Sequence, residues 1–329
     1  MNKFIVTTTI NNITPALKKF DELKNWNLIV IGDKKTPNIN LKNGTFIPAS
    51  DQDSLGFKCA SMIPWNVIQR RNIGFLLALR EGADIIATID DDNIPYDNWG
   101  ENIHIGHHLM RRSISDSLVC DSLFEHSNVT SGKLWHRGFP IQLLEKRKDR
   151  KESISGGFVE VQAGLWDGDP DVDAICRISN GPFDLKFSNS EFVIDYKCFS
   201  PFNTQNTIFS RRISPCMCLL YGVGRMDDIW ASYMSQRVMR ELRSNTLFTG
   251  PTVYQDRNDH DLSKDLEKEM LGYSNTLKFL QRLDSIEVTV DTVIEMYASI
   301  VEGISDLSFI SEEMSNFQRV WLEDIEKIL

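Results

Sequence analysis

The first ninety residues alternate between short apolar runs and segments whose apolar residues recur at helical spacing. Residues 15–23 and 66–81 are predicted helices, the second ending at Gly82. Apolar runs that end in polar residues, as buried parallel strands do, lie at 4–6, 26–31 and 84–89. In an open α/β sheet, ligands bind outside the carboxyl ends of the strands. The polar residues after these three runs should therefore converge on one crevice.

The pattern changes twice further along the chain. Between about residues 113 and 225, Gly, Pro, Ser and aromatic residues favour short strands and loops. After Arg257, apolar residues recur at spacings of three and four, and further helical stretches are predicted near 290–304 and 311–329. We therefore expect an α/β domain over 1–258 and a helical appendage over 259–329. The appendage either packs on the body or presents a surface to a partner.

Charge is concentrated in the predicted appendage, which holds 16 acidic and 6 basic residues, a difference equal to the whole net charge of −10. The remaining body is neutral, which argues against a protein that coats nucleic acid. No apolar stretch is long enough for a membrane span. The six cysteines form no CxxC pair, and Cys216 and Cys218 are predicted to be buried structural residues. Reduced cysteines indicate a cytoplasmic protein.

Three adjacent carboxylates, Asp90, Asp91 and Asp92, follow directly after the third apolar run. Such neighbours repel one another unless a cation lies among them. Oxygen ligands suit Mg²⁺ or Mn²⁺, which commonly bridges one or two carboxylates to substrate phosphates. A divalent metal site is the functional interpretation, and a solvated acidic turn is the alternative.

Basic residues lie near two of the other predicted element ends. Arg70, Arg71 and Asn72 lie near the start of the helix that leads to the aspartates, where guanidinium groups could pair with phosphate or simply face solvent. After the second strand, Asp33 offers a carboxylate for a base or ribose, and Lys34 offers an ammonium group for phosphates.

Two further positions could carry acid–base or metal chemistry. Asp227 and Asp228 lie at the predicted start of a helix, where they serve either as a general base or as residues that favour the helix dipole. His260 is a candidate third metal ligand, with a structural role as the alternative.

The middle of the chain also offers candidate sugar contacts. Three tryptophans could stack on a sugar face or pack in the core, and three aspartates around Pro170 could bind acceptor hydroxyls or line a turn. These residues are Trp135, Trp166 and Trp230, and Asp169, Asp171 and Asp173.

Several segments, in this order along the chain, resemble known families. RNIG at 71–74 with IDDDN at 89–93 looks like the nucleotide-sugar half of GT-A glycosyltransferases. VTTTI at 6–10, VIGDKKTP at 30–37 and RRNIGFLLALREGA at 70–83 resemble the STELLO-type glycosyltransferases. Similarity to both that family and the reversibly glycosylated polypeptides, which are UDP-arabinopyranose mutases, lies in RGFP at 137–140, AGLWDGDPDVDA at 163–174 and GRMDDIWASY at 224–233.

The resemblance implies a GT-A-like mixed sheet flanked by helices and a role for each matching residue. Asp90 and Asp92 would form the metal-binding DxD, with His260 as a further metal or diphosphate ligand. Asp228 or Asp227 would be the general base, and Arg137 would correspond to the sugar-accepting arginine of the mutases. The nucleotide side would be formed by Thr7, Thr8, Thr9, Asp33, and Arg70 or Arg71.

We therefore expect a metal-dependent glycosyltransferase that moves a hexosyl or pentosyl group from a nucleotide-diphosphate sugar, a UDP-sugar, to an acceptor hydroxyl. Inversion at the anomeric carbon and a role in polysaccharide or glycoconjugate synthesis complete this expectation. The partners would be the donor and a saccharide acceptor, without nucleic acid, and a homo-oligomer is compatible with the sequence. A UDP-sugar mutase and a non-catalytic GT-A-like partner protein are the alternatives.

Overall fold

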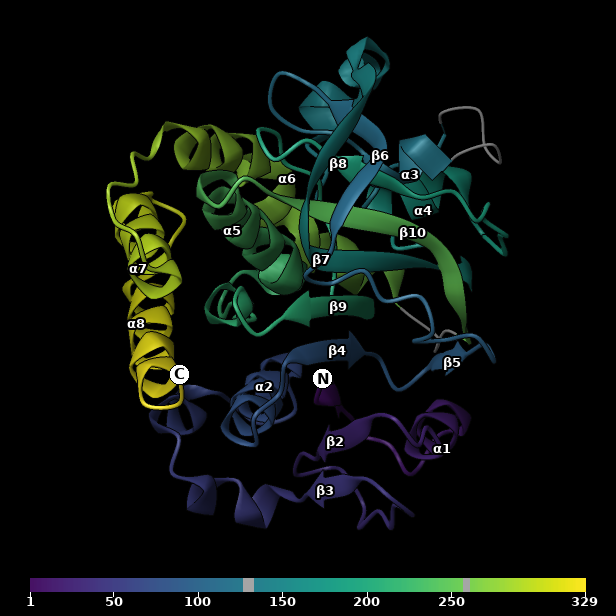
Figure 1. Cartoon of the computed structure of the whole chain (residues 1–329), viewed down its shortest axis with the longest axis vertical. Coiled ribbons are helices and arrows are strands. Elements are labelled where there is room, and N and C mark those ends of the chain that lie inside the picture. Colours follow the sequence, from purple (N-terminus) through teal and green to yellow (C-terminus); the bar gives the residue numbers. More distant parts are fainter. Residues whose placement is uncertain (127–132, 257–260) are drawn as a thin grey trace.

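The computed structural model describes residues 1–126, 133–256 and 261–329. Within those ranges, strands from most of the chain form one large mixed sheet with helices packed against it (Figure 1). The ten strands of the described residues lie in the order β3-β2-β1-β4-β9-β7-β6-β8-β10-β5. This arrangement confirms the predicted α/β class with a mixed sheet flanked by helices.

The N-terminal part of the sheet is parallel, as its apolar runs predict. The pairing joins β1 to β2 and β4, and β2 to β3, all in parallel. The carboxyl ends of these strands therefore lie along one edge of the sheet. The strands are β1 (Lys3–Thr8), β2 (Asn27–Ile31), β3 (Thr45–Ile47) and β4 (Ile85–Ile89).

Two helices accompany these strands. Helix α1 (Pro15–Asp21) begins at Thr14, whose hydroxyl accepts a hydrogen bond from the backbone N–H of Leu17. Helix α2 (Arg71–Arg80) begins later than the predicted Asn66. The reason is local, because Asn66 has a left-handed φ of 60° and Val67 is extended, so neither can start a helix. A 3₁₀ turn then leads into α2.

Short strands are predicted between about residues 113 and 225, where the structure also has one long strand, β7, and a second long strand, β10, lies beyond that region. Strand β7 (Lys151–Gly168) runs for 18 residues and β10 (Ser244–Gln255) for 12, and the two pair in parallel with irregularities in register. The shorter strands after β4 are β5 (Asn93–Pro95), β6 (His108–Ser115), β8 (Phe192–Ile194) and β9 (Asn206–Ser210).

The remaining helices include the three predicted after residue 257. Trp230 of α5 stacks on Phe279 of α6, and the indole N–H of Trp321 in α8 donates to the carbonyl of Pro215. The acidic helices thus pack on the body, while their assignment as a separate domain stays a prediction. The helices are α3 (Ser122–His126), α4 (Ala174–Asn180), α5 (Asp227–Glu241), α6 (Leu262–Ser285), α7 (Val293–Ile304) and α8 (Glu312–Glu326).

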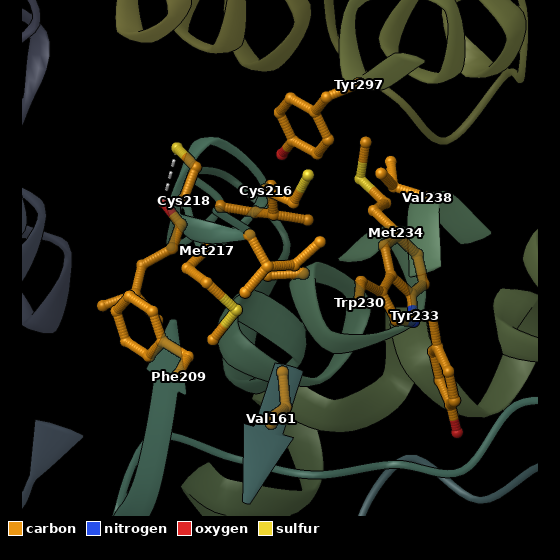
Figure 2. Packing of buried hydrophobic residues seen from close by; sticks show 14 of the residues in the cluster. Val161, Phe209, Cys216, Met217, Cys218, Trp230, Tyr233, Met234, Val238 and Tyr297 are labelled. Atoms are coloured by element: carbon orange, nitrogen blue, oxygen red, sulfur yellow. Dashed lines mark hydrogen bonds between the residues drawn. The ribbon is translucent and has the colours of Figure 1, made fainter. Parts of the chain in front are cut away.

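The largest core cluster joins the α2 and α5 face of the sheet to the C-terminal helices. Figure 2 shows Cys216 and Cys218 inside this cluster, near Tyr297 of α7 and Met234 of α5. All six cysteines are free and buried, and burial raises the pKa of both these thiols well above its usual value. The prediction of a buried structural segment is confirmed. In the described part of the chain, no helix combines the length and apolar character needed to cross a bilayer.

Candidate active site

A crevice of about 530 Å³ lies where the carboxyl end of β4 meets the start of α5. Gln205, just before β9, and Gln255, the last residue of β10, also line it. One wall comes from the C-terminal helices, since Lys268 of α6 is part of the lining. The crevice therefore gathers residues from regions that lie far apart in the sequence. Its ionisable lining residues are Asp90, Asp92, Arg137, Asp171, Arg225, Asp227, Asp228 and Lys268.

The three adjacent aspartates face different surroundings. Asp90 and Asp92 line the crevice, whereas the carboxylate of Asp91 accepts hydrogen bonds from the side chains of Thr9 and Asn11. Asp91 also lines a separate small pocket of about 170 Å³ beside the start of α1, and Asp92 lines this pocket too. The first and third carboxylates, those of Asp90 and Asp92, therefore line the crevice together, whereas that of Asp91 does not.

Asp92 has an oxygen in need of a partner. Its Oδ1 is buried and makes no hydrogen bond with any described residue. Burial, followed by the charges of Asp90 and Asp91, raises the pKa of Asp92 to about 7, while a hydrogen bond from Gln255 acts in the opposite direction. A buried carboxylate oxygen without a donor is suited to a cation.

Arg71 and Arg70 point in different directions although they are neighbours. The guanidinium of Arg71 is buried and donates to Asp90 Oδ1 at 2.7 Å and to the carbonyl of Thr204 at 2.8 Å. Burial raises the pKa of Asp90, and the charge of Arg71 lowers it. Arg70 instead donates to the carbonyl of Ile63 and stacks on Trp65, so the structure does not bring it into the crevice.

Arg137 is held between two carboxylates. Its Nε and Nη2 donate to the two oxygens of Asp171 at 2.8 and 3.0 Å, and its Nη1 and Nη2 donate to those of Asp228 at 3.1 and 3.3 Å. Burial opposes ionisation of Asp171, but the charge of Arg137 outweighs it and holds the pKa of Asp171 well below its usual value. The three residues form a buried, charge-paired network at the base of the crevice.

A glycine makes this network possible. Gly138 has a φ of +81°, and a Cβ at this position would collide with the side chain of Ile229 in α5. The absence of a side chain lets the segment that carries Arg137 approach the first turn of α5, where Asp228 lies.

Asp227 and Asp228 differ in how their oxygens are used. Asp228 is paired with Arg137 and also accepts from the backbone N–H of Thr204. Asp227 accepts from the side-chain amide of Gln69 at 3.0 Å and from the backbone N–H of Asp228 at 3.0 Å. Burial, with the charge of Asp228, raises the pKa of Asp227 to about 7. Asp227 is therefore the carboxylate better suited to accept a proton near neutral pH.

The other residues expected on the nucleotide side take varied places at the same edge of the sheet. Thr8 receives a long hydrogen bond of 3.5 Å from Arg71. Asp33 accepts from the backbone N–H groups of Lys34 and Asn66, which orders the two segments that bear them. Lys34 is exposed, with its ammonium 4.9 Å from the ring of Trp65.

Apart from Asp90, the residues expected on the nucleotide side are not part of the crevice lining. The Thr7 hydroxyl is buried and bonds to the carbonyl of Thr8. Asn72 is buried and bonds to the backbone of Leu219. His260 lies outside the described residues.

The open alternatives in the middle of the chain are resolved residue by residue. All three tryptophans, Trp135, Trp166 and Trp230, are buried. Asp173 caps the start of α4 and Asp169 pairs with Arg177, whereas Asp171 belongs to the crevice network.

Sequence reasoning missed two charged residues of the lining, Arg225 and Lys268, of which Lys268 is the one on the C-terminal helices. It lies in a helix whose apolar spacing gives no hint of a site, and among the described residues it forms no ion pair. Gly224, with a φ of +62°, brings the loop before α5 against the Lys268 carbonyl, where a Cβ would not fit. The only signal in the sequence is that glycine.

The charges of the crevice define what it can bind. Five aspartates and three basic side chains line it, so the fully ionised lining is negative. An anionic ligand would therefore need a cation. Among the described residues, no group of three His, Cys, Asp or Glu side chains has a metal-binding arrangement. Asp90 and Asp92 still fit Mg²⁺ or Mn²⁺, because such ions often take one or two carboxylates and complete their shell with water and phosphate.

A mixed sheet with a carboxylate-rich crevice at the ends of its parallel strands defines a GT-A-like α/β protein. No protein-family model matches the chain. Over 98% of its length the chain is 23% identical to "Probable glycosyltransferase STELLO2" and likewise 23% identical to "Probable glycosyltransferase STELLO1", both of Arabidopsis thaliana. It spans 44% of the length of each of these relatives. These similarities confirm the predicted resemblance to the STELLO-type glycosyltransferase family.

Proposed function

We propose that the chain is a metal-dependent glycosyltransferase that uses a nucleotide-diphosphate sugar as donor and a hydroxyl group as acceptor. The observation that carries this proposal is the buried, unpartnered oxygen of Asp92 in a crevice with a negative lining. The names of the two Arabidopsis relatives support the transferase class. A UDP-sugar is the donor we propose, because the matching segments resemble UDP-sugar enzymes.

Asp90 and Asp92 would hold Mg²⁺ or Mn²⁺, which supplies a positive charge for the diphosphate and for the charge that develops on it as it leaves. Arg71 fixes the orientation of Asp90 through their 2.7 Å contact. Lys268 lines the same crevice and would provide a second positive charge for the phosphates.

Asp227 acts as the general base in this proposal. Its carboxylate takes the proton of the acceptor hydroxyl while the acceptor oxygen bonds to the anomeric carbon. The bond from that carbon to the diphosphate oxygen breaks, and its electron pair leaves with the diphosphate. Asp228 and Arg137 keep the base in place, because Asp228 is fixed by the guanidinium and its N–H donates to Asp227. A base on the acceptor side corresponds to inversion at the anomeric carbon.

The position of Arg137 argues against the mutase alternative. A sugar-accepting arginine would need a free, uncharged nitrogen. Burial lowers the pKa of Arg137, but the charges of Asp171 and Asp228 outweigh it and raise that pKa well above the usual value. An arginine that is held as a cation between two carboxylates is a poor nucleophile.

The donor and the metal can be tested together by thermal denaturation. UDP-, GDP-, CMP- and TDP-sugars are compared with and without Mn²⁺, and one nucleotide is expected to stabilise the protein only when the metal is present. Asp92→Asn should abolish that stabilisation and lower sugar transfer by about 100-fold or more. Asp91→Asn is the matched control, since Asp91 faces Thr9 and Asn11 instead of the crevice.

The outcomes separate the competing functions. Stabilisation by a nucleotide sugar in the Asp92→Asn variant without metal would refute the metal site. Interconversion of sugar ring forms in a sample that contains only a UDP-sugar, followed by chromatography, would favour the mutase. Unchanged cellular function of Asp92→Asn, together with no transfer by the wild type, would favour a non-catalytic partner.

A further inference from the structure

A polar hollow lies on the face of the sheet opposite α2 and α5, and it has no part in the proposed transfer. It has a volume of about 200 Å³ and its floor is formed by β7, β9 and β10. Ile208 on this floor belongs to the smaller core cluster around Trp99, whereas its neighbour Phe209 belongs to the main core. The crevice and the hollow come close at the start of β9, because Gln205 lines the former and Asn206 the latter.

The floor of this hollow carries polar side chains where a sheet face would normally carry apolar ones. Gln162 and Asn206 are both more than nine-tenths buried. They are oriented by hydrogen bonds, Gln162 by the N–H of His104 and Asn206 by the indole N–H of Trp99, each at 3.0 Å. These amides are fixed in place before any ligand arrives, which lowers the entropic cost of binding.

One buried hydroxyl in the lining of the hollow has no partner among the described residues. The Thr249 side chain is 6% exposed, and its hydroxyl makes no hydrogen bond with any described residue. A buried hydroxyl without a partner costs free energy in the absence of a ligand. Gly164 lies opposite Thr249 in the pairing of β7 and β10. A Cβ on Gly164 would lie 2.5 Å from the Asn206 amide nitrogen, so the glycine keeps the floor open.

The rim of the hollow also carries uncharged polar side chains. The side-chain amides of Asn98, Asn102 and Asn189 are exposed at the hollow and bond to no other described residue. The single carboxylate of the lining, Glu191, is paired with Arg111 at 3.3 Å. The hollow therefore offers both donors and acceptors without a net field for an ion. The ring of Trp99 packs against Phe20 and Trp26, so no open aromatic face is present for a nucleobase.

We propose that this hollow binds one residue of a neutral saccharide, separate from the site of transfer. Hydroxyl groups both donate and accept hydrogen bonds, as do amides and the Thr249 hydroxyl, so the chemistry of ligand and lining is matched. The volume is below that of pockets that enclose larger ligands, and it suits a single sugar residue of a longer chain. Such a site holds a glycan on the protein without metal or nucleotide.

The test uses the full chain and a panel of neutral gluco-, galacto-, manno- and xylo-configured oligosaccharides, without metal or nucleotide. Binding is measured by saturation-transfer NMR and calorimetry at millimolar ligand. One configuration should bind the wild type, and Thr249→Val should weaken it roughly three- to tenfold, because valine keeps the shape but removes the hydroxyl. Asn189→Ala should weaken it by a similar factor.

Thr246→Val is the matched control. Thr246 lies on the same strand, and its hydroxyl is likewise buried and unpartnered, but it does not line the hollow. Its substitution should leave saccharide binding unchanged. The proposal is overturned if no oligosaccharide binds the wild type, or if Thr249→Val binds as well as Thr246→Val.

Asp92→Asn distinguishes this site from the crevice. Saccharide binding should persist in this variant even if metal-dependent donor binding is lost. Loss of saccharide binding in Asp92→Asn would place the saccharide in the crevice and overturn the second site. Failure of the donor experiments leaves this test intact, since it uses neither metal nor nucleotide.

Discussion

The crevice and the hollow are two polar cavities on one sheet, and they are polar in different ways. The crevice is lined by five aspartates and three basic residues, of which Arg137, Asp171 and Asp228 are buried and paired with one another. The hollow is lined mainly by amides, a threonine hydroxyl and glycines. Charges select ions and respond to pH and salt, whereas amides select shape and hydroxyl pattern. Under the two proposals, a single fold would separate the chemistry of a transfer reaction from the holding of a saccharide chain.

The largest difference between the two cavities should follow from removal of Arg137, the buried cation of the crevice. Arg137→Met would leave Asp171 and Asp228 buried without their partner, and the free energy of unfolding should fall by about 3–5 kcal/mol. Urea denaturation measures the change. Arg319→Met is the control, because Arg319 is 48% exposed and pairs at the surface with Glu302, which is 72% exposed. It should change stability by less than about 1 kcal/mol. Equal losses in both variants would contradict a special role for the buried network.

The transfer rate in the crevice should depend on pH, whereas saccharide binding in the hollow should not. Asp227 must be ionised to accept a proton, and burial raises its pKa to about 7, so the transfer rate should fall about tenfold per pH unit below that value. Initial rates between about pH 5 and 9 measure this. Saccharide binding in the hollow should stay constant over the same range. A slow, pH-independent Asp227→Asn variant would agree with the base role, whereas an unchanged rate profile would exclude it.

The two cavities should respond differently to a change on α6. Lys268→Ala removes the positive charge of the crevice wall, and donor affinity should fall about five- to tenfold, while stability and saccharide binding stay unchanged. Calorimetric titration with the donor and Mn²⁺ provides the measurement. Lys264→Ala on the same helix is the control, since Lys264 pairs with Asp261 at the surface. Equal effects of both substitutions would indicate only a general change in net charge.

Salt gives the smallest effect and the simplest comparison. Raising the ionic strength from about 0.05 to 0.5 M should weaken donor binding roughly threefold, because ions screen the partly exposed charges of the crevice. Saccharide binding should not change, since the hollow uses uncharged groups. A similar salt dependence in both cavities would show that the hollow recognises its ligand through charge.

The sequence predicts the parts of this molecule that depend on local pattern. Asp90 follows the last residue of β4, and Asp227 is the first residue of α5. Their meeting at one edge of the sheet therefore follows from the directions of the strand and the helix. Which member of a neighbouring pair faces the crevice could not be predicted. Arg71 contacts Asp90 of the crevice lining and Arg70 does not, because one step at the 3₁₀ turn before α2 rotates the side chain to another side.

The rest depends on tertiary structure. Strand β7 is buried over much of its length, so its alternation does not show, and its pairing with β10 is irregular. Lys268 reaches the crevice through the packing of α6 on the loop that contains Gly224, almost two hundred residues after Asp90 in the chain. The hollow was not predicted either, because its amides come from four separate segments that only the folded sheet brings together.

The wall formed by Lys268 has a consequence for biosynthesis. A protein chain leaves the ribosome from its N-terminus, and its early parts begin to fold first. The strands with the aspartates therefore emerge well before α6, and the cleft lacks one side until translation has passed Lys268. A nascent chain that stalls before this point carries Asp90 and Asp92 in a crevice that lacks this side, and the crevice is complete only after α6 has been made.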